Sequence, residues 1–176
     1  MRRIGLLVGG AMILAMAGCA TDGGGSASLG ADLRDSGGRT LVRATLSPAG
    51  SAIRVRVEAA GLPAGNYAAH IHAVGRCDPP DFTSAGPHWN PTGRQHGRLN
   101  PMGPHLGDLP NLNVGADGAG SVEFVVPGAS LGRGSRGLSD GDGTALVVHA
   151  GPDDYRTDPS GNSGARLACG VIAAPR

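Results

Sequence analysis

The chain after residue 30 alternates short apolar runs with turn residues. The clearest run covers residues 52–59, "AIRVRVEA", in which Ile53, Val55 and Val57 alternate with charged side chains. A period of two residues predicts a strand with one buried face and one solvent-exposed face. No helical period of useful length follows residue 30, so the pattern predicts an all-β domain.

Other apolar runs extend this pattern. Between them lie turn signals such as "SPAG" and "GADGAG", the second of which predicts a hairpin turn. The chain's 32 glycines and 13 prolines agree with frequent turns. Short strands joined by turns favour a sandwich or a barrel. The further predicted strands cover residues 40–47, 66–74, 112–114, 121–126, 145–150 and 165–173.

The first nineteen residues read differently. "MRR" is followed by an apolar stretch too short for a comfortable membrane span, which ends in "LAMAGC". This resembles a bacterial lipoprotein signal, with residues 1–18 as signal peptide and a lipid on Cys19. The alternative is an ordinary secretory signal cleaved nearby. Residues 19–37 would then supply the anchor and a flexible Gly/Ser-rich tether, and 38–176 the domain.

In both interpretations the protein is exported, so we expect it in the periplasm or cell envelope. With a lipid on Cys19, the N-terminus would attach to a membrane, and Ala20 after the cysteine favours the outer membrane. The net charge of +1 and the lack of a basic cluster predict no nucleic-acid partner.

The cysteine count also fits export. If Cys19 is lipidated, Cys77 and Cys169 remain, and an even pair in an oxidising compartment predicts one disulfide. The alternative is two free buried thiols.

Three histidines lie on predicted strands. His70 and His72 are two residues apart, so their side chains point to the same face and can converge on one ion. Alone, this pair would more often be two half-exposed strand residues. His149 ends another apolar run and, by itself, would more often be a core residue.

The other three histidines lie in residues 86–108, a stretch with nine Gly or Pro residues and almost no hydrophobic periodicity. His88, His96 and His105, with Asp108, form a set that suits tetrahedral Zn²⁺ at roughly 2 Å from each donor. The alternative is a solvated histidine-rich loop. The three strand histidines form an all-imidazole set that suits copper.

Several motifs occur in one order: "HIHAVGRC", "TSAGPHWNP", "QHG", "GPHLGDLPN", "ALVVHAGPDD" and "GNSGARLACGVIA". Together they resemble copper–zinc superoxide dismutase in its exported bacterial form, from about residue 38 to the C-terminus. The resemblance implies a Greek-key β-barrel of about eight antiparallel strands with two long functional loops. It implies one copper and one zinc per subunit, and superoxide as substrate.

The resemblance also assigns the metal ligands. His88 belongs to both sets and would bridge the metals as an imidazolate, which is reasonable only between two cations. The implied copper ligands are His70, His72, His88 and His149, and the implied zinc ligands are His88, His96, His105 and Asp108.

Three further roles follow from the resemblance. Asp153 would hydrogen-bond one histidine of each metal, with its neighbour Asp154 as the alternative. Cys77 and Cys169 would form the intrasubunit disulfide. Arg166 would attract the anionic substrate beside the copper, and His88 would give a proton to the peroxide product.

The chain departs from the family at two places. The segment 151–164 is short and has no lysine to guide the substrate, so Arg156 is the basic residue available there. Trp89 stands where Phe or Tyr is more familiar. The rival functions are a metal carrier without turnover and a purely structural barrel. The sequence does not settle oligomeric state, and a homodimer is compatible with the resemblance.

Overall fold

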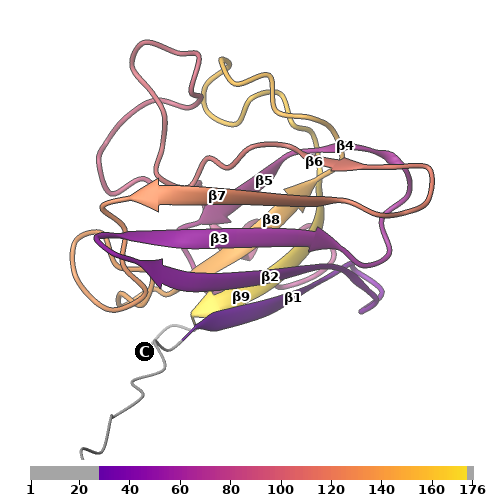
Figure 1. Cartoon of the computed structure of the whole chain (residues 1–176), viewed down its shortest axis with the longest axis horizontal. Helices are drawn as coiled ribbons and strands as arrows, with labels where there is room; N and C mark the ends of the chain where they lie inside the picture. The colour runs from indigo at the N-terminus through magenta and orange to yellow at the C-terminus, as the bar shows by residue number, and fades with distance from the viewer. Residues whose placement is uncertain (1–27, 174–176) are drawn as a thin grey trace, which may run out of the picture.

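The computed structural model describes residues 28–173 and shows an all-β protein (Figure 1). Within this range the one helical element is the short 3₁₀ helix η1 (Thr83–Ala85). No helix there is long and apolar enough to cross a membrane. The strands are β1 (Leu29–Arg34), β2 (Thr40–Ala49), β3 (Ala52–Ala59), β4 (Gly65–Tyr67), β5 (Ala69–His72), β6 (Leu112–Val114), β7 (Ser121–Pro127), β8 (Thr144–His149) and β9 (Arg166–Ala173).

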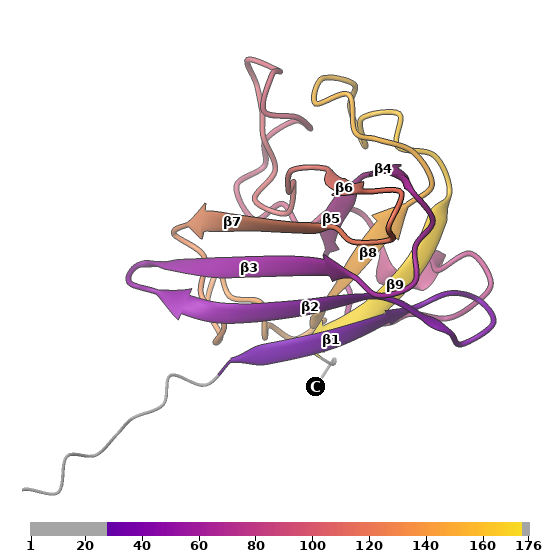
Figure 2. The same ribbon diagram turned by 45° about the vertical axis from the view of Figure 1, so that its right-hand side comes forward.

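Seven strands form one antiparallel sheet in the order β5-β8-β9-β1-β2-β3-β7, and β4 pairs with β6. The sheet curls, so that β5, β8 and β9 cross behind β2, β3 and β7 (Figures 1 and 2). Strand neighbours that are distant in sequence, such as β5 with β8, require the crossing connections of a Greek key. The all-β antiparallel fold class is therefore confirmed, with nine strands over residues 28–173 and a half-barrel rather than a closed ring of hydrogen bonds.

The core confirms the alternating pattern of β3. Ile53, Val55 and Val57 are each 1% exposed, while Arg54 and Arg56 between them face solvent. Burying each such side chain contributes about 1.5–3 kcal/mol to the free energy of unfolding. Because aromatic residues are few, the core consists chiefly of aliphatic side chains from both sides of the curled sheet, including Leu33, Leu46, Ile71, Leu112 and Leu146.

The first strand lies within the segment 19–37, all of which the sequence assigns to the anchor and tether. β1 pairs with β2 along its length, and Leu33 is fully buried. The Gly/Ser-rich composition hid a weak period of two, in which Leu29, Ala31 and Leu33 alternate with polar residues or glycine. The folded domain therefore includes Leu29–Arg34, ahead of the predicted boundary at residue 38. The predicted signal peptide, residues 1–18, and Cys19 lie outside the described residues.

The predicted strand at residues 66–74 is two strands. β4 pairs with β6, whereas β5 pairs with β8. Ala68 between them donates its N–H to the carbonyl of Gly151 at 2.9 Å. The chain thus leaves one sheet and joins the other at this residue, which a hydrophobic pattern alone does not reveal.

The histidine-bearing loop lies along the free edge of β5. Ile71 donates its N–H to Gly107 at 2.9 Å and accepts a hydrogen bond from the N–H of Trp89 at 2.8 Å. A Cβ on Gly107 would lie 2.4 Å from the carbonyl oxygen of Ile71, so only glycine allows this approach. The buried indole of Trp89 belongs to the core. Backbone pairing therefore holds both ends of the loop beside His70 and His72.

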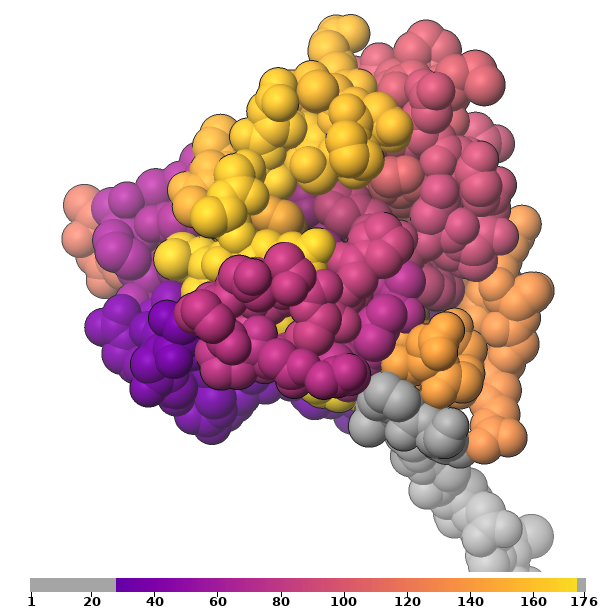
Figure 3. Space-filling model, turned by 180° about the vertical axis from the view of Figure 1, so that it is seen from behind, coloured from indigo at the N-terminus to yellow at the C-terminus, as the bar shows by residue number. Residues whose placement is uncertain are grey.

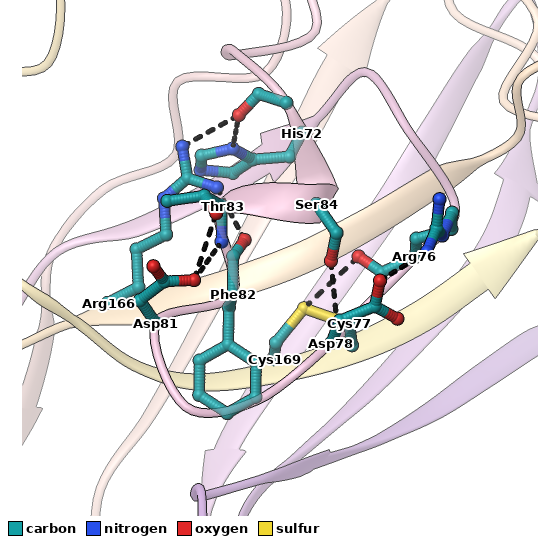
Figure 4. Close-up of a disulfide and its surroundings, with 11 residues drawn as sticks. His72, Arg76, Cys77, Asp78, Asp81, Phe82, Thr83, Ser84, Arg166 and Cys169 are labelled. Carbon is teal, nitrogen blue, oxygen red and sulfur yellow. Dashed lines mark hydrogen bonds and ion pairs between the residues drawn. A yellow bond between two sulfur atoms is a disulfide. The ribbon is translucent and has the colours of Figure 1, made fainter.

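A disulfide joins Cys77 to Cys169, as the sequence predicts, across 92 residues and with a Cα–Cα distance of 5.6 Å. It ties the segment 75–86 to β9 (Figure 4). The sulfur of Cys169 is deeply buried, so the bridge anchors this segment directly to the core.

Candidate metal centre

Four histidines converge at one end of the half-barrel. His70 and His72 come from β5, His149 ends β8, and His88 lies in the loop that covers the edge of β5. All four are buried, and one ring nitrogen of each lies within 4.8 Å of the corresponding nitrogens of the others. The structure therefore brings together the predicted all-imidazole set.

Hydrogen bonds fix the orientation of three of these rings. His72 Nδ1 donates to the carbonyl of Gly86 at 2.8 Å, and His149 Nδ1 donates to the carbonyl of Gly164 at 3.2 Å. His70 Nε2 donates to Asp153 Oδ2 at 3.0 Å. Carbonyl and carboxylate oxygens can only accept, so each ring must carry its proton on that nitrogen.

The opposite ring nitrogens then carry free lone pairs. These atoms are buried and have no hydrogen-bond partner among the described residues, which is a costly arrangement. A cation at the point where they converge would satisfy all of them. The atoms concerned are His70 Nδ1, His72 Nε2, His88 Nε2 and His149 Nε2.

Three of these rings are held in the neutral form that a metal ligand requires. Burial lowers the pKa of His88 to about 4, against the opposing effect of Asp108. Burial, with the charges of His70 and other neighbours, lowers the pKa of His149 to about 3. Burial likewise lowers the pKa of His72 well below its ordinary value. At neutral pH these nitrogens bind metal without first losing a proton.

A second cluster surrounds Asp108. Its Oδ1 lies 2.9 Å from His88 Nδ1, 3.1 Å from His96 Nδ1 and 3.2 Å from His105 Nδ1. Tetrahedral coordination at about 2.0–2.1 Å places ligand atoms about 3.3 Å apart, which matches these separations. Asp108 Oδ2 accepts backbone N–H groups from Gly97 and His105, which leaves Oδ1 for the ion. His70 also approaches this cluster, but its Nε2 is committed to Asp153.

His96 shows why the second cluster needs a cation. Its Nε2 lies 2.9 Å from Asp153 Oδ1, while its Nδ1 faces Asp108 Oδ1. A neutral ring has one proton for these two acceptors. Burial lowers the pKa of His96, but both carboxylates outweigh that effect and raise it to about 9. A metal ion at Nδ1 would take the place of the second proton.

Asp153 lies where the sequence predicts it. One oxygen accepts a hydrogen bond from His70 and the other from His96, so a single carboxylate orients a ring of each cluster. Burial raises its pKa, but these bonds outweigh burial and hold the pKa below its usual range. Asp154 instead points away and accepts hydrogen bonds from Thr157 and other loop groups.

The support for Asp153 comes from residues that sequence reasoning missed. Asn111 donates its side-chain amide to the carbonyl of Asp153 at 3.0 Å and accepts the N–H of Asp153 at 2.9 Å. Gly161 packs against the carboxylate, and a Cβ there would lie 1.8 Å from Asp153 Oδ1. Asn111 ends the motif "GPHLGDLPN" and Gly161 begins "GNSGARLACGVIA", but the local sequence does not show that either residue contacts Asp153.

Arg166 begins β9 and is held by the segment that the disulfide anchors. Its guanidinium donates to the carbonyl of Phe82 at 2.6 Å and to that of Gly86 at 2.7 Å. Gly86 also accepts the proton of His72, so one oxygen joins Arg166 to the four-imidazole cluster (Figure 4). The positive charge of Arg166 is one of the causes that lower the pKa of His72.

A cavity of about 510 Å³ opens over this cluster. In the space-filling view it lies in the hollow where the yellow, pink and magenta loops meet (Figure 3). Arg166, His88 and His149 line it, as does Arg94, which the sequence analysis did not single out. Arg156, the basic residue available in the segment 151–164, is exposed and is not part of this lining.

Fold and site together define a β-barrel metalloprotein with two adjacent histidine-rich metal sites. The family described as "Copper/zinc superoxide dismutase (SODC)" matches residues 39–172. The chain therefore belongs to the copper/zinc superoxide dismutase family. Its cofactors are copper and zinc, and its activity is superoxide dismutation, an oxidoreductase reaction.

Individual relatives agree. Superoxide dismutase [Cu-Zn] 1 of Aquifex aeolicus is 45% identical over 144 residues, 81% of this chain and 85% of that protein. Superoxide dismutase [Cu-Zn] of Caulobacter vibrioides is 46% identical over 138 residues, 77% of this chain and 79% of that protein. The crystal structure of a SOD-like protein from Bacillus subtilis has a TM-score of 0.76 and 40% identity, and the match covers 81% of this chain and 97% of that one.

Proposed function

We propose that the four converging imidazoles hold copper and that the cluster around Asp108 holds zinc. The observation that carries this assignment is the set of four buried ring nitrogens without a hydrogen-bond partner. His88 presents Nε2 to this set and Nδ1 to Asp108, so it is the bridging ligand. The copper ligands are then His70, His72, His88 and His149, and the zinc ligands are His88, His96, His105 and Asp108.

Copper, when bound, supplies the one-electron chemistry by which two superoxide anions and two protons become dioxygen and hydrogen peroxide. Arg166 attracts each anion to the cavity and orients it, because two backbone carbonyls hold its charged guanidinium in place. Whenever His88 Nε2 is not bound to metal, it could hold a proton and pass it to the departing peroxide. His88, His96, His105 and Asp108 would hold zinc, which would fix the loop and the orientation of the His88 ring.

Asp153 acts on both metals by orienting their histidines. Its two hydrogen bonds set which nitrogen of His70 and His96 carries the proton, and so which nitrogen is free to bind.

We further propose that the protein acts outside the cytoplasm and protects the cell envelope from exported or external superoxide. The residues 1–18 have the pattern of a signal peptide, Cys19 is the expected lipid attachment site, and a disulfide fits an oxidising compartment. Labelling with a radioactive fatty acid tests the anchor: the wild-type chain should incorporate label in the membrane fraction, and Cys19→Ser should not.

The family resemblance is compatible with a homodimer. Sedimentation velocity of the mature domain measures its oligomeric state directly.

The decisive experiment combines metal analysis with activity. We expect about one copper and one zinc per chain, with rapid removal of superoxide. His149→Ala should lose copper and keep zinc, because His149 Nε2 belongs to the four-imidazole cluster alone. Wild-type copper content in this variant would contradict the ligand assignment. A fully metallated protein that leaves superoxide untouched would instead support a metal carrier.

A further inference from the structure

The cavity over the copper cluster has a second guanidinium in its lining besides that of Arg166. We propose that Arg94 attracts the superoxide anion into this cavity. The segment 151–164 has no lysine that could do so. Arg94 lies in the histidine-bearing loop, residues 86–108, two residues before His96. It lines the cavity together with Arg166 and His88. The inference rests on the proposed copper site as the place where superoxide reacts.

The structure holds Arg94 in place. Asn90 accepts its backbone N–H at 3.1 Å and donates to its carbonyl at 2.7 Å. One guanidinium nitrogen donates to the carbonyl of Gly103 at 3.1 Å. The side chain is therefore fixed across the loop, while its remaining N–H groups stay free for an anion.

Within residues 28–173, Arg94 forms no ion pair. The ion pairs formed within residues 28–173 involve other arginines, most of them on the outer face of the sheet. Arg94 is exposed and lines the cavity, so its charge is accessible to an approaching anion.

One carboxylate shares the cavity wall with the two guanidinium groups. Asp158 lines the cavity, but its Oδ1 accepts the backbone N–H of His96 at 2.6 Å. The wall therefore keeps an excess of positive charge as long as Arg94 is present. Without Arg94, the lining would keep one guanidinium, that of Arg166, and one carboxylate, that of Asp158. Charge on the wall of a cleft raises the rate at which a small anion enters it.

Arg156 provides a matched control. It is the other basic residue near the site by sequence, it is exposed, and it does not belong to the cavity lining. Arg156→Gln changes the net charge by the same amount as Arg94→Gln. The two variants therefore separate a local effect in the cavity from an effect of total charge. Arg94→Lys restores the charge without the guanidinium.

The test measures the second-order rate constant for superoxide removal by the copper- and zinc-loaded protein over a range of ionic strength. At low ionic strength Arg94→Gln should be about two- to fourfold slower than wild type, and Arg94→Lys close to wild type. Arg156→Gln should show a smaller decrease. The deficit of Arg94→Gln should close at high salt, where charges further apart than the Debye length no longer interact.

Azide provides a readout that does not depend on turnover. Its binding, followed through the Cu(II) absorption band, should weaken in Arg94→Gln by a factor similar to the rate change, with metal content unchanged. Equal effects of Arg94→Gln and Arg156→Gln, a deficit that persists at high salt, or unchanged azide affinity would each overturn the proposal. A wild-type protein that binds copper and azide but spares superoxide would overturn the proposed function instead, and the azide titration would still test Arg94.

Discussion

At the scale of single residues, one carboxylate connects the two metal clusters. Asp153 accepts a hydrogen bond from His70 on one oxygen and from His96 on the other. Its neighbour Asp154 has the same side chain but serves the loop, through Thr157 and Asn162. The adjacent pair therefore allows the connection to be tested with a built-in comparison.

We expect Asp153→Asn to weaken metal binding by about 10- to 100-fold. An amide offers one acceptor oxygen and one N–H donor, so it cannot accept from both His70 and His96. Chelator competition for copper and zinc measures the two affinities separately. Asp154→Asn, as the control, should leave both near wild type; unchanged affinities in Asp153→Asn would show that the carboxylate does not orient the ligands.

The sequence revealed the metal-facing residues better than their supports. The eight cluster and orienting residues carry motif spacings that a reader can recognise, and the structure brings them together. Asn111 and Gly161 also fall within these motifs, but their role comes from contact with Asp153, which only the folded chain shows; Asp153 is 42 positions from Asn111. Arg94 was missed for a similar reason, since only the folded loop shows that it lines the cavity.

At the scale of elements, the segment 75–86 positions Arg166, the residue proposed to attract the substrate. Its carbonyls at Phe82 and Gly86 accept both hydrogen bonds of Arg166, and the disulfide at Cys77 holds the segment against β9. The proposed zinc ligands, by contrast, lie in residues 88–108, whose ends pair with the edge of β5. The two parts of the site therefore depend on different anchors.

Reduction of the disulfide should separate these two parts. Turnover should fall, because Arg166 loses its fixed acceptors, while zinc content stays near one per chain. The free energy of unfolding should decrease by about 4–5 kcal/mol, because the bridge closes a loop of 92 residues. Activity, zinc content and denaturant unfolding of oxidised and reduced protein measure the three effects. A Cys77→Ala/Cys169→Ala double variant controls for metal removal by the reductant; full turnover in this variant would contradict the idea.

The elements themselves were largely predictable. The runs that became β2, β3, β7, β8 and β9 carry clear alternating or apolar patterns, and the structure places these strands within two residues of the predicted bounds. β1 was missed because its apolar positions are few and its neighbours are Gly and Ser. The break at Ala68 was missed because β4 and β5 pair with different strands. The local pattern of hydrophobic residues does not show which strand is the hydrogen-bond partner.

At the scale of the whole molecule, the metal-free protein should be most stable near pH 6.5. The pKa values of His88 and His149 in the folded state, about 4 and about 3, lie below their ordinary value of 6.5. Below pH 6.5 these two histidines therefore bind protons more readily in the unfolded chain than in the folded chain. The free energy of unfolding thus decreases as the pH falls from 6.5. The pKa of His96 is raised to about 9, so its contribution is lost as pH rises from 6.5 towards 9.

Thermal unfolding of the metal-free protein between pH 4 and 9, followed by circular dichroism, measures this dependence. His96→Gln should lose the decrease on the alkaline side, because the residue that takes up the proton is gone. A wild-type melting temperature that stays level or rises from pH 6.5 to 9 would contradict the assignment of a protonated His96 in the absence of zinc.

The early start of β1 sets how far the barrel can stand from a membrane. Residues 20–28 separate Cys19 from Leu29, and nine residues fully extended reach about 30 Å. A tether running to residue 37 would have reached about twice as far. With a lipid on Cys19, the barrel would thus stay within about 30 Å of the bilayer surface. Superoxide formed at or passing through that surface would meet the copper site before it spread into the surrounding volume.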